Sequence, residues 1–170
     1  MRVVLDTNVL VAAHATVGLC HEVLVSVTKH HELVFFTGML TELERVLREK
    51  VKMTPANARE VVDLLSVDSI PVEPEVLPPS VCRDPDDCVV LGTALAGRAD
   101  LIVSGDEDLL TIGSFRGIPI ISPRGCFERL RPSRGGAGQV AERRRTWGSG
   151  VRRNPNARVR ERRRRAKRRG

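Results

Sequence analysis

Aromatic side chains are scarce in this chain: they make up 3% of its 170 residues, with no Tyr and a single Trp. Proteins that bind nucleic acids by base stacking depend on exposed rings, so this composition argues against that mode of binding. No apolar run approaches the roughly 20 residues that a membrane-spanning helix needs. Residues 1–5 meet an aspartate too early to form a signal-peptide core. We therefore expect a soluble, cytoplasmic protein with no membrane partner.

Closely spaced metal-binding or redox cysteines are also missing. The four cysteines contain no C-x-x-C pair, which favours buried or idle thiols over a zinc site or redox pair. They are Cys20, Cys82, Cys88 and Cys126. The four histidines are interpreted as structural or solvated, and none lies near the acidic motifs described below: His14, His21, His30 and His31. The chain has no G-x-x-x-x-G-K-[ST] phosphate loop and no G-x-G-x-x-G fingerprint.

The two signs of charge are unevenly spread along the chain. Residues 1–130 hold 12 Lys and Arg against 19 Asp and Glu, a net charge of −7. Residues 131–170 hold 16 against 2, a net charge of +14, and both segments together give the +7 of the whole chain. We therefore expect an acidic folded domain over residues 1–130. The Arg-, Gly- and Pro-rich remainder cannot bury enough apolar surface to offset its ordering entropy, which predicts a disordered tail over residues 131–170.

This basic tail has three interpretations. We rank first a sequence-independent hold on nucleic-acid phosphates, which weakens steeply with salt because each contact releases counterions. The second is that the tail folds back on the acidic domain and masks it. The third is an extension with no selected role.

Strand-like and helix-like segments alternate up to residue 130. Strands are expected at residues 3–5, 33–36, 69–72, 101–104 and 117–121. Helices are expected from residue 8, over 19–29, over 41–50, from Pro55, over 86–97 and over 123–130. Strands separated by helices imply crossover connections and a largely parallel sheet. The predicted fold class is α/β, a three-layer α/β/α arrangement around a mostly parallel sheet.

Carboxylates recur where the apolar segments end. Asp6 follows the first apolar run, Asp106 and Asp108 follow another, and Asp84 and Asp87 precede a long apolar helix. Ligands bind in open α/β sheets at the carboxyl ends of the strands. Crowded carboxylates repel one another unless cations lie between them. The sequence therefore predicts a metal site at this edge.

Four short acidic segments occur in order: Asp6-Thr7-Asn8, Thr41-Glu42-Leu43-Glu44, Arg83-Asp84-Pro85-Asp86-Asp87 and Ser104-Gly105-Asp106-Glu107-Asp108-Leu109-Leu110. In their strand and helix context they resemble the acidic motifs of PIN-domain ribonucleases, particularly the toxins of bacterial toxin–antitoxin systems. The resemblance covers about residues 1–130. It implies a PIN-like fold and metal-dependent hydrolysis of RNA phosphodiester bonds. It also implies a cognate antitoxin and a homodimer as partners.

The resemblance also suggests a role for each acid. Four acids are predicted to be catalytic and to bind Mg²⁺ or Mn²⁺: Asp6, Glu42, Asp87 and Asp106. Asp84 and Asp108 are second choices, as direct ligands or as holders of metal-bound water. Asn8 and Ser104 are expected to orient ligands or to contact phosphate. Both Mg²⁺ and Mn²⁺ prefer such oxygen ligands.

Plainer interpretations stand beside these. Asp6, Asp84 or Asp86 could each cap a helix, and capping and catalysis are equally weighted for Asp108. Capping does not explain why Asp6 and Asp87 occur together with other acids. A haloacid-dehalogenase interpretation is poor, because Asn8 stands where that family needs a second aspartate. A receiver-domain interpretation is poor, because the strand at Leu101 ends in serine and glycine and not in the lysine that such a domain needs. Two functional alternatives stay open: a catalytically silent nucleic-acid-binding or regulatory protein, and a nuclease that acts on DNA.

Overall fold

The sheet at the centre of the molecule contains, within the described part of the chain, six strands in the order β3-β2-β1-β4-β6-β5. A computed structural model describes residues 1–67, 69–78, 80–82 and 84–130. The strands are β1 (Arg2–Leu5), β2 (Glu32–Phe35), β3 (Ser69–Pro71), β4 (Leu101–Val103), β5 (Ser114–Phe115) and β6 (Ile118–Ile121). All neighbouring strands pair in parallel except β5 and β6, which are antiparallel. The predicted mostly parallel sheet is confirmed, whereas the predicted disorder of residues 131–170 lies outside the described residues.

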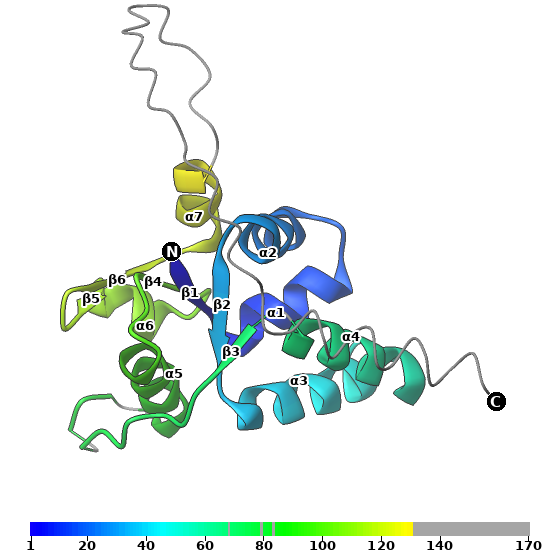
Figure 1. The fold of residues 1–170 in the computed structure, drawn as a ribbon, viewed down its shortest axis with the longest axis horizontal. Helices are drawn as coiled ribbons and strands as arrows, with labels where there is room; N and C mark the ends of the chain where they lie inside the picture. Colours follow the sequence, from blue (N-terminus) through cyan, green and yellow to red (C-terminus); the bar gives the residue numbers. More distant parts are fainter. Residues whose placement is uncertain (68, 79, 83, 131–170) are drawn as a thin grey trace, which may run out of the picture. The chain divides into compact units, whose positions relative to one another are not determined.

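Helices cover both faces of this sheet (Figure 1). They are α1 (Thr7–Ala15), α2 (Leu19–His30), α3 (Thr37–Glu49), α4 (Pro55–Val67), α5 (Pro85–Ala96), α6 (Glu107–Ile112) and α7 (Pro123–Leu130). Alternating residues of β1 belong to two separate cores. Val3 and Leu5 pack in the core that includes α1 to α4 and α7, and Val4 packs in the core that includes α5 and α6. This alternation builds the three-layer α/β/α fold that the sequence predicted.

Helix α3 begins four residues earlier than predicted. It starts at Thr37, shortly after β2, so the predicted helix start at residue 41 is wrong and Glu42 lies in the second helical turn. A glycine at position 38 argues against a helix start on propensity alone. Here, however, the Phe36 ring occupies the place of a side chain, since a Cβ on Gly38 would lie 2.1 Å from the ring. Local packing therefore selects glycine inside the first turn.

Two short elements were not predicted. Helix α6 spans six residues, and β5 spans two and pairs antiparallel with β6. The turn between β5 and β6 places Arg116 at φ 47° and Gly117 at φ 85°. Two successive residues with positive φ are typical of the tight turns that join twisted hairpin strands. Elements this short carry too few residues to show a period.

Among the described residues, no single helix is long and apolar enough to cross a membrane; α1 and α2 pass such a test only as a pair, and they are bent by 111° at their break.

Candidate metal centre

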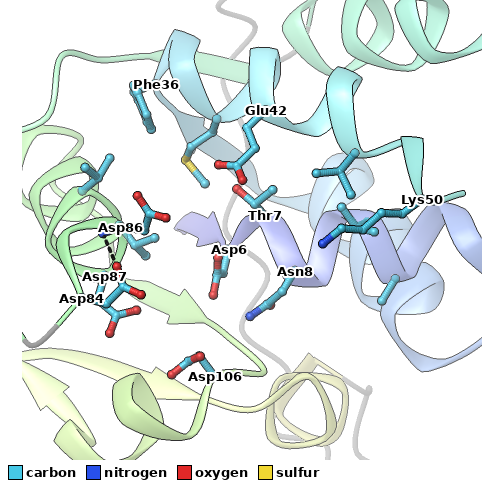
Figure 2. Close-up of a pocket in the computed structure, with 16 residues that line it drawn as sticks. Asp6, Thr7, Asn8, Phe36, Glu42, Lys50, Asp84, Asp86, Asp87 and Asp106 are labelled. Carbon is cyan, nitrogen blue, oxygen red and sulfur yellow. Dashed lines mark hydrogen bonds between the residues drawn. The ribbon is translucent and has the colours of Figure 1, made fainter. Parts of the chain in front are cut away.

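Five of the six predicted acids line one cavity of about 460 Å³ at the carboxyl edge of the sheet (Figure 2). Strands β1 and β4 are paired in parallel up to Leu5 and Val103, so the segments that follow them leave the sheet side by side. Asp6, Glu42, Asp84, Asp87 and Asp106 all line the cavity, and Asp86, Thr7 and Asn8 join them. The topology therefore brings together four segments that are distant in sequence.

Asp6 lies at the start of α1 but does not cap it through its side chain. Its Oδ2 instead accepts a hydrogen bond of 2.5 Å from the hydroxyl of Ser104, a fully buried residue at the end of β4. Burial raises the pKa of Asp6, although the bonds from Ser104 and from backbone N–H groups oppose that shift. Asp6 therefore holds the N-cap position of α1, as the capping interpretation expected, while its carboxylate, bonded to Ser104, lines the cavity with a fixed orientation.

Ser104 connects two of the acids. Its Oγ donates to Asp6 and accepts from the backbone N–H of Asp106 at 2.9 Å. Asn8 makes a parallel link, because its Oδ1 accepts from the backbone N–H of Gly105 at 3.3 Å. Both side chains thus hold the loop after β4 against the start of α1. The expectation that they orient acidic residues agrees with these contacts.

Replacing Ser104 with alanine is expected to lower metal affinity and activity by about 10–100-fold, as the loss of a ligand-orienting partner usually does. The hydroxyl stabilises the charged form of Asp6, so its removal should raise the pKa of Asp6 and weaken metal binding most at acidic pH. Calorimetric Mn²⁺ titrations at several pH values would measure this. Ser66→Ala, on the exposed side of α4, is the matched control. An unchanged affinity in Ser104→Ala would contradict the orienting role.

Asp84 and Asp106 each cap a helix. One oxygen of Asp84 accepts from the backbone N–H of Asp86 at 2.9 Å, at the start of α5. One oxygen of Asp106 accepts from the N–H groups of Asp108 at 2.8 Å and Leu109 at 3.4 Å, at the start of α6. In both cases the bonds use Oδ1 only. Capping therefore fixes each carboxylate and leaves its second oxygen for another partner.

The tightest cluster combines Asp87 with Asp106 and Asp108. One carboxylate oxygen from each of the three lies within 4.8 Å of the other two. The pKa of Asp87 is raised to about 6, first by burial and then by the negative charges of Asp106, Asp84, Asp6 and Asp108. A divalent cation relieves such repulsion, and an all-carboxylate donor set suits Mg²⁺ or Mn²⁺. The residues thus fit a hard divalent cation.

Glu42 faces this cluster from α3, across the cavity and near Thr7 (Figure 2). Its carboxylate lies 3.7 Å from the guanidinium of Arg45, a partner on the same helix. Asp108 belongs to the tight cluster but not to the residues that line the cavity. Which of the six predicted acids bind the ion therefore stays a prediction.

The site includes residues that the sequence did not indicate as functional. Thr7 and Asp86 belong to the predicted acidic segments, but neither was among the predicted site residues. Lys50, at the far end of α3, also lines the cavity. A lysine at a helix end carries no signal of its own, because the helix dipole alone favours it there. Only the crossing of α1 and α3 reveals that it belongs to the pocket.

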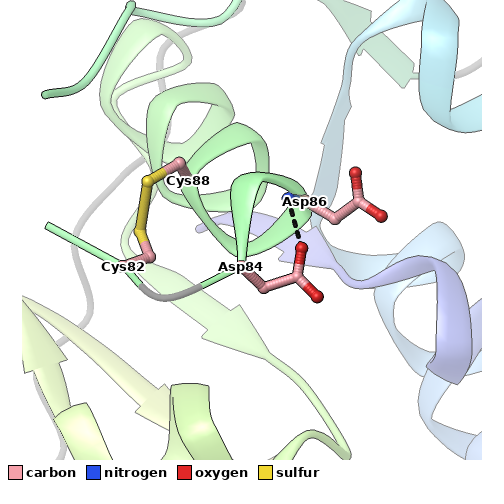
Figure 3. Close-up of a disulfide and its surroundings, with 4 residues drawn as sticks. All are labelled: Cys82, Asp84, Asp86 and Cys88. Carbon is pink, nitrogen blue, oxygen red and sulfur yellow. Dashed lines mark hydrogen bonds between the residues drawn. A yellow bond between two sulfur atoms is a disulfide. The ribbon is translucent and has the colours of Figure 1, made fainter. Parts of the chain in front are cut away.

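A disulfide joins Cys82 to Cys88 beside these acids (Figure 3). The prediction of idle thiols is therefore wrong for this pair, whereas Cys20 and Cys126 are free as expected. The chain turns at Asp84 and enters α5, which brings the two Cα atoms to 5.7 Å, within the usual range for a disulfide. The ring they close contains Asp84, Asp86 and Asp87, so it constrains the segment that carries three of the acids.

Replacing both cysteines with serine is expected to lower the free energy of unfolding by about 2 kcal/mol, the loop-closure value for so short a ring. Metal affinity should fall with it, since the acidic segment loses a constraint. Urea denaturation with and without a reductant would measure the change. Reductant should bring the wild type to the stability of the Cys82→Ser/Cys88→Ser variant and leave that variant unaffected. A wild type insensitive to reductant would contradict the prediction.

The fold and the acidic pocket define an α/β protein with a carboxylate site suited to a divalent cation. A family model of the PIN domain matches residues 2–108. The chain belongs to the PIN domain family, whose members are generally nucleases and typically use a divalent metal. No curated protein matches the chain.

One solved structure with a similar fold is VapBC2 from Rickettsia felis, crystallised with a DNA fragment from its promoter. The match has a TM-score of 0.52 at 13% sequence identity and covers 72% of this chain and 98% of the other. At this identity the likeness concerns the fold, and it supports the predicted PIN-like architecture.

Proposed function

We propose that this protein is a metal-dependent endoribonuclease that hydrolyses RNA phosphodiester bonds with Mg²⁺ or Mn²⁺. The observation that carries the proposal is the cluster of Asp87, Asp106 and Asp108, whose oxygens lie within 4.8 Å of one another in a family of nucleases. Residues 1–130 carry the activity in this proposal. A basic tail over residues 131–170 would add a sequence-independent hold on phosphates.

The protein's contribution to the reaction is mainly positioning and charge. Asp6, Asp87 and Asp106 would hold the cation, with Asp108, Asp84 and Glu42 as further carboxylates at the same edge. A divalent cation held there would lower the pKa of a bound water and would stabilise charge on the phosphate. Ser104 orients the carboxylate of Asp6, and Asn8 fixes the loop before Asp106. No histidine lines the cavity within the described residues.

The test is cleavage of an end-labelled single-stranded RNA with Mn²⁺ or Mg²⁺, with and without excess EDTA. We expect cleavage that depends on the metal. Unlabelled RNA should inhibit cleavage of the labelled RNA more strongly than single-stranded DNA of the same sequence does. Better competition by DNA would shift the proposal to a DNA-directed nuclease. Binding without cleavage of any nucleic acid would favour the catalytically silent alternative.

The same proposal extends to partners. The fold likeness to VapBC2, a toxin–antitoxin complex, supports a role as a toxin restrained by a cognate antitoxin. A homodimer is part of the proposal because the resemblance to PIN-domain toxins implies one. Sedimentation equilibrium of the full chain would measure the dimer. Growth arrest on expression, absent in an Asp6→Asn variant, would test the toxin role.

A further inference from the structure

Lys50 is the one basic side chain that lines the acidic cavity within the described residues. The cavity is otherwise charged only by aspartates and Glu42. Figure 2 shows Lys50 at the opposite end of the cavity from Asp84 and Asp87, with its ammonium pointing into the cavity toward Asn8. The predicted metal ligands do not explain why a lysine ammonium lies in this acidic cavity.

The surroundings of Lys50 leave its charge available. Its backbone N–H donates to the carbonyl of Val46 at 2.8 Å, which anchors it at the end of α3. Among the described residues, its ammonium forms no ion pair with a carboxylate. Arg45 on the same helix contrasts with it, because its guanidinium lies 2.9 Å from Glu49 and 3.7 Å from Glu42. The helix dipole explains a lysine at this end but not its orientation into the cavity.

An apolar wall, formed by Val11 and Ala12 of α1 and Val46 of α3, lines the same cavity as Lys50 and the carboxylates. On α3, Val46 follows Glu42 by four residues and precedes Lys50 by four, so it stands between them along one face of the helix. Lys50 lies eight residues after Glu42, about 12 Å along the helix at about 1.5 Å per residue. The ammonium is therefore placed to bind a phosphate next to the one that is cleaved. The apolar wall is placed to contact the sugar or base between those two phosphates.

We propose that Lys50 and this apolar wall form a subsite for the nucleotide next to the cleaved bond. Lys50 binds the flanking phosphate, and Val11, Ala12 and Val46 contact the sugar or base. An ammonium is a compact charge that binds phosphate without reading sequence, so the subsite recognises an oligonucleotide chain rather than a particular base. This inference rests on the proposed nuclease function and deepens it.

The test combines variants with a substrate altered at one phosphate at a time. A short RNA cleaved at one bond is prepared with a neutral methylphosphonate at each flanking linkage. For the wild type, neutralising one particular flanking linkage should raise KM about tenfold, the value of one charge-assisted contact. The Lys50→Met variant should show a raised KM on natural RNA and no further increase on that altered RNA. Lys50→Arg should keep most of the sensitivity.

Lys52→Met is the matched control. Lys52 lies two residues after Lys50, and its exposed side chain is outside the cavity, so the substitution removes the same charge elsewhere. It should retain the wild-type sensitivity to the altered linkage. A Lys50→Met variant that stays as sensitive as the wild type to every neutral linkage overturns the subsite alone. Absence of metal-dependent cleavage of natural RNA by the wild type overturns the proposed function and the subsite together.

Discussion

Asp6→Asn is expected to lower kcat/KM for RNA cleavage by more than the roughly hundredfold that loss of an orienting partner costs. The substitution keeps the size of the side chain, and the amide oxygen can still accept the bond from Ser104. It removes a negative charge close enough to Asp87 to raise the pKa of that carboxyl. Cleavage of a labelled RNA under saturating Mn²⁺ measures the activity, and circular dichroism with thermal melting measures the fold.

The matched control is Asp63→Asn, which removes the same charge from the exposed side of α4, outside the cavity. It should cleave RNA like the wild type. Calorimetric Mn²⁺ titration of Asp6→Asn should show weakened binding, which separates loss of the metal from loss of substrate contact. A folded Asp6→Asn protein with full turnover would remove Asp6 from the site and undermine the nuclease proposal.

The acidic edge could be predicted because its residues follow apolar strands. Asp6 and Asp106 come after runs that are buried on both faces, and a parallel sheet places the carboxyl ends of such strands together. Asp87 could be predicted from its place at the start of a long apolar helix. A local pattern plus one topological rule thus placed these three acids in one cavity.

Other features depend on contacts that no local pattern contains. Lys50 enters the site because α3 crosses α1, and Cys82 reaches Cys88 because the chain turns at Asp84. The choice between helix cap and ligand was also out of reach from sequence. Asp84 shows why, since one of its oxygens caps α5 while its carboxylate lines the acidic cavity. The two roles are compatible in three dimensions, although the sequence presented them as alternatives.

Asp87→Asn is expected to stabilise the metal-free protein at pH 7.5. The pKa of Asp87 is about 6 in the folded protein, raised by burial and by four neighbouring aspartates, against 3.8 for an ordinary Asp. The folded state therefore binds this proton more tightly than the unfolded chain does. Its contribution to stability is complete below about pH 3.8 and is lost as the pH rises through about 6. The neutral amide avoids that loss, which we expect to be on the order of 1 kcal/mol after solvent screening.

The same variant should lose most of the stabilisation that a divalent cation gives the wild type, because ligand binding stabilises the folded state in proportion to its affinity. Urea denaturation at pH 4 and pH 7.5, in EDTA and in Mg²⁺, gives all the comparisons, with KCl matching the ionic strength. At pH 4 the folded wild type carries Asp87 largely protonated, so the metal-free wild type and variant should differ much less than at pH 7.5. A plain acidic surface would respond to KCl as it does to Mg²⁺. Two outcomes would therefore argue that no bound cation relieves the repulsion among these carboxylates. One is that the two salts raise the free energy of unfolding of the wild type equally. The other is that Mg²⁺ raises it as much in Asp87→Asn as in the wild type.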